Sequence, residues 1–154
     1  VKAMNSFKGL PHRFEIFLKK NHVTFINDSK ATSFKASLSA LSSLKNIFWI
    51  LGGLPKQNDK INVYKYKKNI MKCYLIGKNI NYFKKQIKGK LIFSTTKNLK
   101  KSIIQILKDS KEYKEKNISI LLSPAAASYD QFENFEKRGE EFKRLCRIYA
   151  RKFI

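Results

Sequence analysis

Val23-Thr-Phe-Ile-Asn27 is a short run of β-branched and aromatic residues bounded by polar residues, which is the composition of a buried strand. Beyond it, Phe34, Leu38 and Leu41 recur at the spacing of one helix face. The stretch therefore predicts a strand that runs directly into a helix. This pairing decides the fold, because a repeated strand-then-helix unit builds a parallel sheet.

The same unit recurs along the rest of the chain. Further strands are predicted at 46–51, which Gly52-Gly53 stops, and at 70–76, 91–93 and 118–122. Helical spacing follows the last three, first through Tyr82, Phe83 and Ile87, then through Ile103, Ile104 and Leu107, and finally along the C-terminal segment. The alternation predicts a single Rossmann-like α/β domain, with a mostly parallel sheet of about five or six strands and helices on both faces.

The C-terminal segment predicts the longest helix. Ser128-x-x-Gln131 has the form of a capping box, which predicts the start of this helix. Apolar residues then keep a three-four spacing on one face, at Phe132, Phe135, Phe142, Cys146, Tyr149 and Phe153. Gly139 falls on the same stripe. Close approach of another backbone and a tolerated weak point in the helix both explain a glycine there, and the sequence leaves the two open.

Composition indicates one folded domain in a chain of 154 residues, of which 43% are hydrophobic. The longest apolar run, 47–51, is far shorter than a membrane span, so we expect no membrane association and a cytoplasmic location. Cys73 and Cys146 form no CxxC or His/Cys cluster, which predicts reduced, packed thiols and no metal site. The chain starts at Val1 rather than Met, so we expect a piece of a longer polypeptide.

The formal charge of +22 raises the hypothesis of a nucleic-acid-binding protein. Only five of the 33 basic residues are arginine, whereas specific phosphate and base contacts favour the arginine fork. We therefore expect a solvated lysine coat and no nucleic-acid partner. A basic polyanion-binding module, with Tyr64, Tyr66 and Tyr82 among the lysines, remains the alternative from another class.

Polar loops follow three predicted strands, at 28–32, 52–56 and 123–128. Ligands of open α/β sheets bind at the carboxyl ends of strands, where helix N-termini favour anions, so these loops predict a site for a small carboxylate. Each loop also has a purely structural reading, since Asp28 or Ser29 fits a helix cap and the glycine pair fits a tight turn. Residue patterns alone predict no reaction, because the sequence holds only two histidines and no Walker A loop.

Four ordered motifs resemble a known family. They are Gly9-Leu10-Pro11-His12-Arg13, the segment 25–32, Gly52-Gly53 with Lys56, and the segment 121–139, which reads Leu-Leu-Ser-Pro-Ala-Ala-Ala-Ser and continues to Arg138-Gly139. Together they resemble the UDP-N-acetylmuramoyl-L-alanine:D-glutamate ligases of the Mur ligase superfamily. The resemblance covers only the C-terminal, amino-acid-binding domain, at 11–154, with 1–10 as the end of the linker from the central domain. The UDP-binding and ATPase domains of the family have no counterpart in the chain.

Within the superfamily, the resemblance points to D-glutamate as the amino acid that is added. The chain has Asp28-Ser29-Lys30-Ala31-Thr32 where members that add other residues tend to carry an aspartate-tyrosine-type motif. Another amino-acid-adding Mur ligase stays as an alternative. The chain departs from the family pattern at Ser33, at Leu54-Pro55 and at Tyr129, which bears on the detail of the pocket.

The resemblance implies a role for each matching residue. Lys30 would act at the reacting centre, and Arg138 would support the domain interface. Residues that would bind D-glutamate are Thr32, Lys56, Ser128, Tyr129 and Phe135, and residues that would face the nucleotide are His12, Arg13 and Asp28. Implied partners are D-glutamate, UDP-N-acetylmuramoyl-L-alanine, ATP or ADP, and the remaining domains of the polypeptide. ATP and Mg²⁺ would be held mainly by the central domain, the protein would be a monomer, and the isolated domain would be inactive.

Overall fold

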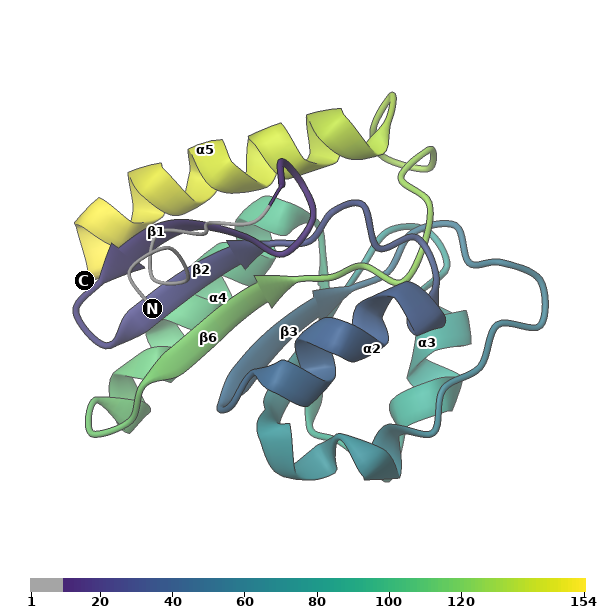
Figure 1. Ribbon diagram of the computed structural model, residues 1–154, viewed down its shortest axis with the longest axis horizontal. Coiled ribbons are helices and arrows are strands. Elements are labelled where there is room, and N and C mark those ends of the chain that lie inside the picture. The colour runs from purple at the N-terminus through teal and green to yellow at the C-terminus, as the bar shows by residue number, and fades with distance from the viewer. Residues whose placement is uncertain (1–9) are drawn as a thin grey trace.

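Six strands form one sheet in the computed structural model, which describes residues 10–154 (Figure 1). Across the sheet the strands follow the order β1-β2-β6-β3-β4-β5, and only β1 runs antiparallel to its neighbour. This confirms the predicted, mostly parallel α/β sheet. The expected linker lies almost entirely outside the described residues. The strands are β1 (Glu15–Lys20), β2 (Val23–Asn27), β3 (Ile47–Leu51), β4 (Ile70–Ile76), β5 (Phe93–Lys97) and β6 (Ile118–Leu122).

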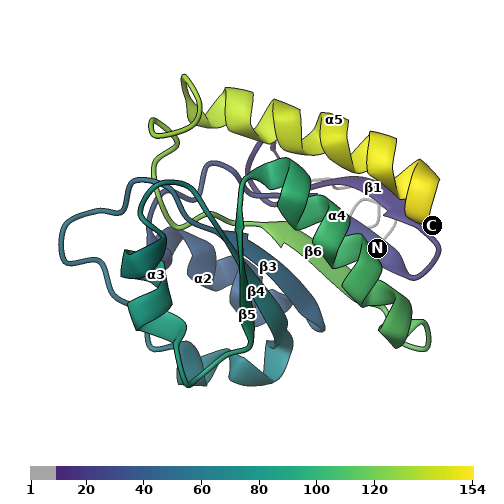
Figure 2. The ribbon, with the colours of Figure 1, turned by 180° about the vertical axis from the view of Figure 1, so that it is seen from behind.

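Helices cover both faces of the sheet, as the alternating pattern predicts (Figures 1 and 2). On one face α4 (Leu99–Asp109) and α5 (Phe135–Phe153) pack on alternate strand residues such as Phe25, Phe48 and Ile50. On the other, α2 (Phe34–Ser43) and α3 (Ile80–Ile87) pack on Trp49 and its neighbours. Every residue of β3 and β6 is buried, because a central parallel strand is covered on both sides. Short 3₁₀ turns complete the fold at Val63–Lys65, Lys67–Asn69 and Ser110–Tyr113.

The capping-box prediction at Ser128 is wrong. The Ser128 carbonyl accepts hydrogen bonds from the backbone N–H groups of both Gln131 and Phe132, which makes a turn. Helix α5 begins only at Phe135, where the Asn134 side chain accepts from the backbone N–H of Lys137 at 2.8 Å. A four-residue pattern cannot distinguish a turn from a cap when a better cap residue follows a few positions later.

The strand predicted at 91–93 lies further along the chain, at β5. The backbone N–H groups of Lys90 and Leu91 still donate to the Ile87 carbonyl, so the chain is leaving α3 at that point. Strand β5 contains Ser94, Thr95 and Thr96, which an edge strand tolerates and an apolar-run criterion passes over. The antiparallel edge strand β1 was not predicted, although it contains the apolar run Ile16-Phe17-Leu18, and none of its residues is fully buried.

Gly139 provides room for a side chain rather than for another backbone. A Cβ atom placed on Gly139 would overlap the imidazole ring of His12 and would stand 2.9 Å from the Asn27 amide nitrogen. The expected approach of another backbone is therefore wrong, because the group that comes close to Gly139 is the His12 side chain. Both cysteines are free and buried, as expected. None of the described helices is long and apolar enough to cross a membrane.

Asp109, the last residue of α4, connects that helix to β4 through hydrogen bonds from Lys72 and Tyr74. Burial by itself raises the pKa of Asp109, but hydrogen bonds from Tyr74 (2.6 Å), Lys72 (2.9 Å) and Gln105 (2.8 Å) outweigh it and leave the pKa lowered. A lowered folded-state pKa contributes stability above the ordinary carboxyl value of 3.8, and this contribution is lost as the pH falls through the folded-state pKa.

We predict that Asp109→Asn lowers the free energy of unfolding near neutral pH by about 1–3 kcal/mol. The difference from the wild type should shrink as the pH falls below the ordinary carboxyl range. Urea unfolding at a series of pH values measures both effects. The exposed Glu112→Gln is the matched control, with little expected change. A pH-independent loss in Asp109→Asn would contradict the assignment.

Candidate functional site

The three polar loops meet at the carboxyl edge of the sheet, as the sequence predicts. The Asp28 N–H donates to the Leu122 carbonyl at 2.7 Å, and the Gly52 N–H donates to the Pro124 carbonyl at 2.9 Å. Leu54 and Ala127 exchange two backbone hydrogen bonds, each of 2.9 Å. Asp28 Oδ2 also accepts from Ser123 Oγ at 2.7 Å, so the loops after β2 and β3 are both bonded to the loop after β6. Together we call these three loops the rim.

Arg138 of α5 is hydrogen-bonded to two of these loops, the one after β2 and the one after β6. Its guanidinium is fully buried and donates to Ser29 Oγ at 2.9 Å, to the Ser29 carbonyl at 2.6 Å and to the Ala126 carbonyl at 2.9 Å. Burial lowers its pKa to about 10, so the group stays charged at neutral pH. The resemblance implies interface support for Arg138, and the structure shows that its side chain is buried within this domain.

Three of the predicted site residues form one cluster. The Lys30 ammonium lies 5.8 Å from the centre of the Phe135 ring, and the His12 ring meets the same aromatic ring edge-on at 6.0 Å. The Lys30 N–H also donates to the His12 carbonyl at 2.9 Å, and Ser29 Oγ donates to the Phe135 carbonyl at 2.8 Å. These contacts place an exposed ammonium group on a rigid aromatic and backbone platform.

A pocket of about 360 Å³ opens beside this cluster. It contains Asp28, whose carboxylate accepts from the Phe14 N–H at 3.0 Å and from Ser123 Oγ at 2.7 Å. Burial raises the Asp28 pKa, and these hydrogen bonds together with the charge of Arg13 oppose the shift. The lining thus brings together three predicted residues, because it consists of Arg13, Phe14, Asp28, Lys30, Ala31, Ala36, Ser39 and Ala40.

The other predicted residues lie on the rim loops without a described contact to one another. Lys56 is exposed, and its carbonyl accepts from the Asp59 N–H; the Asp59 carboxylate in turn accepts from the Phe34 N–H at 2.9 Å, at the start of α2. Thr32 is half-buried. Ser128 is buried, whereas the Tyr129 side chain next to it is 71% exposed. The structure thus places these residues at one edge without defining their contacts to a ligand.

Asp130 fixes the loop that carries Ser128 and Tyr129. Its Oδ2 accepts from the backbone N–H of Lys78 at 2.9 Å, which connects this loop to the segment after β4. A Cβ at Gly77, which has a φ of +91°, would press against the Asp130 carboxylate. Asp130 lies within the 121–139 motif, but the sequence pattern alone gave this residue no role.

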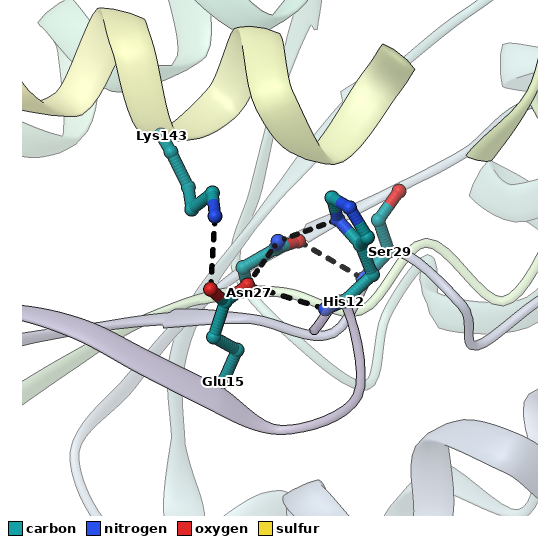
Figure 3. Close-up of polar contacts among 5 residues, drawn as sticks. All are labelled: His12, Glu15, Asn27, Ser29 and Lys143. Carbon is teal, nitrogen blue, oxygen red and sulfur yellow. Dashed lines mark hydrogen bonds and ion pairs between the residues drawn. The ribbon is translucent and has the colours of Figure 1, made fainter. Parts of the chain in front are cut away.

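Below the rim, a chain of polar contacts leads from α5 to His12 (Figure 3). Lys143 pairs with Glu15 at 2.8 Å, Glu15 accepts from the Asn27 amide at 2.9 Å, and the Asn27 amide contacts His12 Nδ1 at 2.9 Å. Burial raises the pKa of Glu15, but hydrogen bonds from Lys143, His12 and Asn27 outweigh it and leave it lowered. Sequence reasoning missed Glu15, Asn27 and Lys143, because no local pattern connects residues so far apart.

Metal ions in proteins are commonly held by groups of His, Cys, Asp or Glu side chains. No group of three or more His, Cys, Asp and Glu side chains lies close enough together between residues 10 and 154 to hold an ion. The rim offers lysine ammonium groups, hydroxyls and backbone N–H groups, which are donors for anions.

The open, mostly parallel α/β sheet places the chain in the class of Rossmann-like domains, in which small ligands commonly bind at the carboxyl edge. Comparison with known proteins identifies the relatives within this class. The chain is a relative of the UDP-N-acetylmuramoylalanine–D-glutamate ligases, which confirms the resemblance found in its motifs. No family model matches the chain.

The similarity extends over nearly all of the chain. The chain is 40% identical to the ligase of Nitrobacter winogradskyi and 41% identical to that of Bartonella henselae, in each case over 92% of the length of this chain. It is 39% identical to the ligase of a Wolbachia of Brugia malayi over 98% of its length. In all three comparisons the chain spans about 30% of the relative's length.

We predict that Arg138→Lys lowers the free energy of unfolding by about 2–4 kcal/mol, because the compact ammonium group lacks the planar fork that reaches Ser29 and Ala126 from three nitrogens, and so leaves buried acceptors unpaired. Urea unfolding measures the loss. The exposed neighbour Lys137→Ala is the control and should change stability by about 0.5 kcal/mol at most. Equal stabilities for the two variants would mean that Arg138 does not hold the rim.

Proposed function

We propose that this chain is the C-terminal, amino-acid-binding domain of a D-glutamate-adding Mur ligase. The observation that carries the proposal is the meeting of the loops of Lys30, Lys56 and Ser128 at one sheet edge, in a chain related to D-glutamate ligases over 92–98% of its length. As part of a longer protein, the domain would bind D-glutamate and present its amine to the activated carboxyl group of UDP-N-acetylmuramoyl-L-alanine.

D-Glutamate carries two carboxylates and one amine, and the rim residues match that pattern. The exposed Lys56 and the hydroxyls of Thr32 and Ser128 would hold the two carboxylates, with Phe135 against the aliphatic part of the ligand. Fixing both carboxylates leaves the amine pointing in one direction, so orientation supplies much of the rate gain. Tyr129 would border the ligand on the solvent side, since its side chain is exposed beside Ser128.

Lys30 would act closest to the bond that forms. The amine attacks the carbonyl carbon of an acyl phosphate, and negative charge develops on the carbonyl oxygen. The carbon–oxygen bond to phosphate then breaks, and the amine gives up one proton, which leaves with the phosphate as the amide forms. An ammonium group on the rigid Phe135 and His12 platform would stabilise that charge without having to reorganise. Its position is set by the backbone bond to His12, so the effect depends on the platform as well as on the charge.

ATP supplies the activation of the carboxyl group, and the described residues of this chain do not fit an independent Mg²⁺ site. The pocket of Arg13, Asp28 and Lys30 would contribute to one side of the nucleotide, with His12 beside it. The remaining domains of the longer polypeptide would hold the metal and most of the triphosphate. We propose a cytoplasmic, monomeric enzyme whose isolated C-terminal domain is inactive.

The proposal predicts phosphate release that depends on D-glutamate in the full-length polypeptide that contains this chain, with ATP, Mg²⁺ and UDP-N-acetylmuramoyl-L-alanine present. Lys56→Ala should raise the KM for D-glutamate by roughly 10- to 100-fold, because it removes a charge-assisted hydrogen bond. Lys30→Ala should mainly lower kcat. Steady-state kinetics on both variants separates the two roles.

Lys60→Ala is the matched control, since it removes an exposed lysine from the same loop as Lys56 and should leave the kinetic constants unchanged. Release that is equal with D-glutamate and L-glutamate would refute the assignment, and a response to another amino acid would indicate a different Mur ligase. Steeply salt-dependent binding to RNA without any ligase activity would instead support the polyanion-binding alternative.

A further inference from the structure

The orientation of the Asn27 side chain is determined by its neighbours. Asn27 is completely buried, and its Oδ1 accepts from the backbone N–H of Ser29 at 3.2 Å. The amide nitrogen consequently faces the other way, toward Glu15 Oε2 and His12 Nδ1, each at 2.9 Å. The reversed amide would set its oxygen against the Glu15 carboxylate, so only one orientation satisfies the site.

Glu15 accounts for one of the two hydrogens on the Asn27 amide nitrogen. The carboxylate is held by Lys143 at 2.8 Å and by the backbone N–H of His12 at 3.2 Å, and these bonds together with that from Asn27 lower its pKa, so it remains an acceptor. The second hydrogen of the amide then points to His12 Nδ1 (Figure 3).

His12 Nδ1 must accept that hydrogen. In a neutral imidazole one nitrogen carries the proton and the other accepts, so an accepting Nδ1 places the proton on Nε2. A doubly protonated ring, or a proton on Nδ1, would bring two N–H groups face to face within the buried site. The ring is also restrained from moving away, because the Phe135 edge and the Cβ-free surface of Gly139 enclose it.

We propose that Asn27 is a positioning residue that fixes His12 as the neutral Nε2–H tautomer, which makes the second ring nitrogen, Nε2, a hydrogen-bond donor. His12 adjoins Arg13, and its carbonyl accepts from the N–H of Lys30, so the backbone of His12 lies beside two residues that line the pocket. The complement of the Nε2 donor is an oxygen acceptor without a proton to give, such as a phosphate oxygen. The tautomer stands on the network alone, whereas its use toward a nucleotide phosphate rests on the proposed function.

The tautomer is measured directly by long-range ¹H–¹⁵N correlation of the histidine rings in the ¹⁵N-labelled chain at pH 7.5. His22 is the only other histidine, so a His22→Gln sample assigns both rings. We expect His12 to show a protonated Nε2 and an unprotonated Nδ1. A proton on Nδ1, a doubly protonated ring or a fast mixture of the two neutral tautomers would overturn the proposal without any variant being needed.

Asn27→Asp tests the role of Asn27 itself. Aspartate keeps an acceptor for the Ser29 N–H but has no hydrogen to give, so His12 should shift toward the Nδ1–H form. An unchanged Nε2–H spectrum in a folded Asn27→Asp protein would show that Asn27 does not set the tautomer. Circular dichroism checks the fold, and the wild-type spectrum decides the tautomer whether or not this variant folds.

Two substitutions of His12 test its use in the full-length polypeptide. Glutamine can place an N–H near the position of Nε2, whereas asparagine places its N–H near that of Nδ1. His12→Gln should therefore keep the KM for ATP within about threefold of the wild type, and His12→Asn should raise it by about tenfold or more. Equal values for the two variants would refute the donor role. Absence of D-glutamate-dependent activity in the wild type would refute the proposed function and leave the tautomer result intact.

Discussion

The buried guanidinium of Arg138 is the interaction on which the geometry of the site depends. Its three hydrogen bonds reach two loops that are separated by about a hundred residues in sequence, and none of its hydrogen-bond acceptors is a carboxylate. Two of the three acceptors are main-chain carbonyls, which accept in fixed directions, so the planar fork determines where Ser29 and Ala126 stand relative to α5. Burying the charge itself opposes folding, so the contribution of this side chain comes from the hydrogen bonds that its fork makes.

The consequence extends to the groups that would meet a ligand. Ser29 is bonded both to Arg138 and to the Phe135 carbonyl, and the Phe135 ring supports Lys30 and His12. The first turn of α5 and the loop after β2 therefore behave as one unit. Asp28, one residue earlier, is bonded to Ser123 of the neighbouring loop. Lys30 thus stands on a platform whose Ser29, Phe135 and Arg138 polar groups are hydrogen-bonded to one another.

Sequence patterns predict the parts of this architecture that depend on local composition. The strands at 70–76 and 118–122 match β4 and β6, because buried parallel strands are continuous apolar runs. The edge strands were missed or displaced, since an edge strand such as β5 tolerates Ser, Thr and Lys. Both Ser128 and Asn134 are suitable capping residues for α5, and the local sequence does not decide between them. Helix α5 begins after Asn134.

In the candidate site, too, local motifs predict which loop a residue occupies but not which distant residue it contacts. Motifs located Lys30, Asp28 and Arg138 on the correct loops and helix, but the meaning of Gly139 required the position of His12, a residue 127 positions away in the sequence. The contacts of Glu15, Asn27 and Lys143 connect β1, β2 and α5, and no periodicity encodes such a connection. The pairing partners of buried polar groups are set by the fold as a whole.

The edges of the sheet have a consequence for how copies of this domain behave at high concentration. Strand β1 ends in Lys19 and Lys20, and strand β5 ends in Lys97, whose φ of +73° turns the chain away from the extended conformation. Lysine on an exposed edge opposes the pairing of that edge with a second chain, because like charges would stand opposite each other. With a formal charge of +22 the repulsion acts over the whole surface as well, so the lysine-rich composition protects a six-stranded sheet from growing by aggregation.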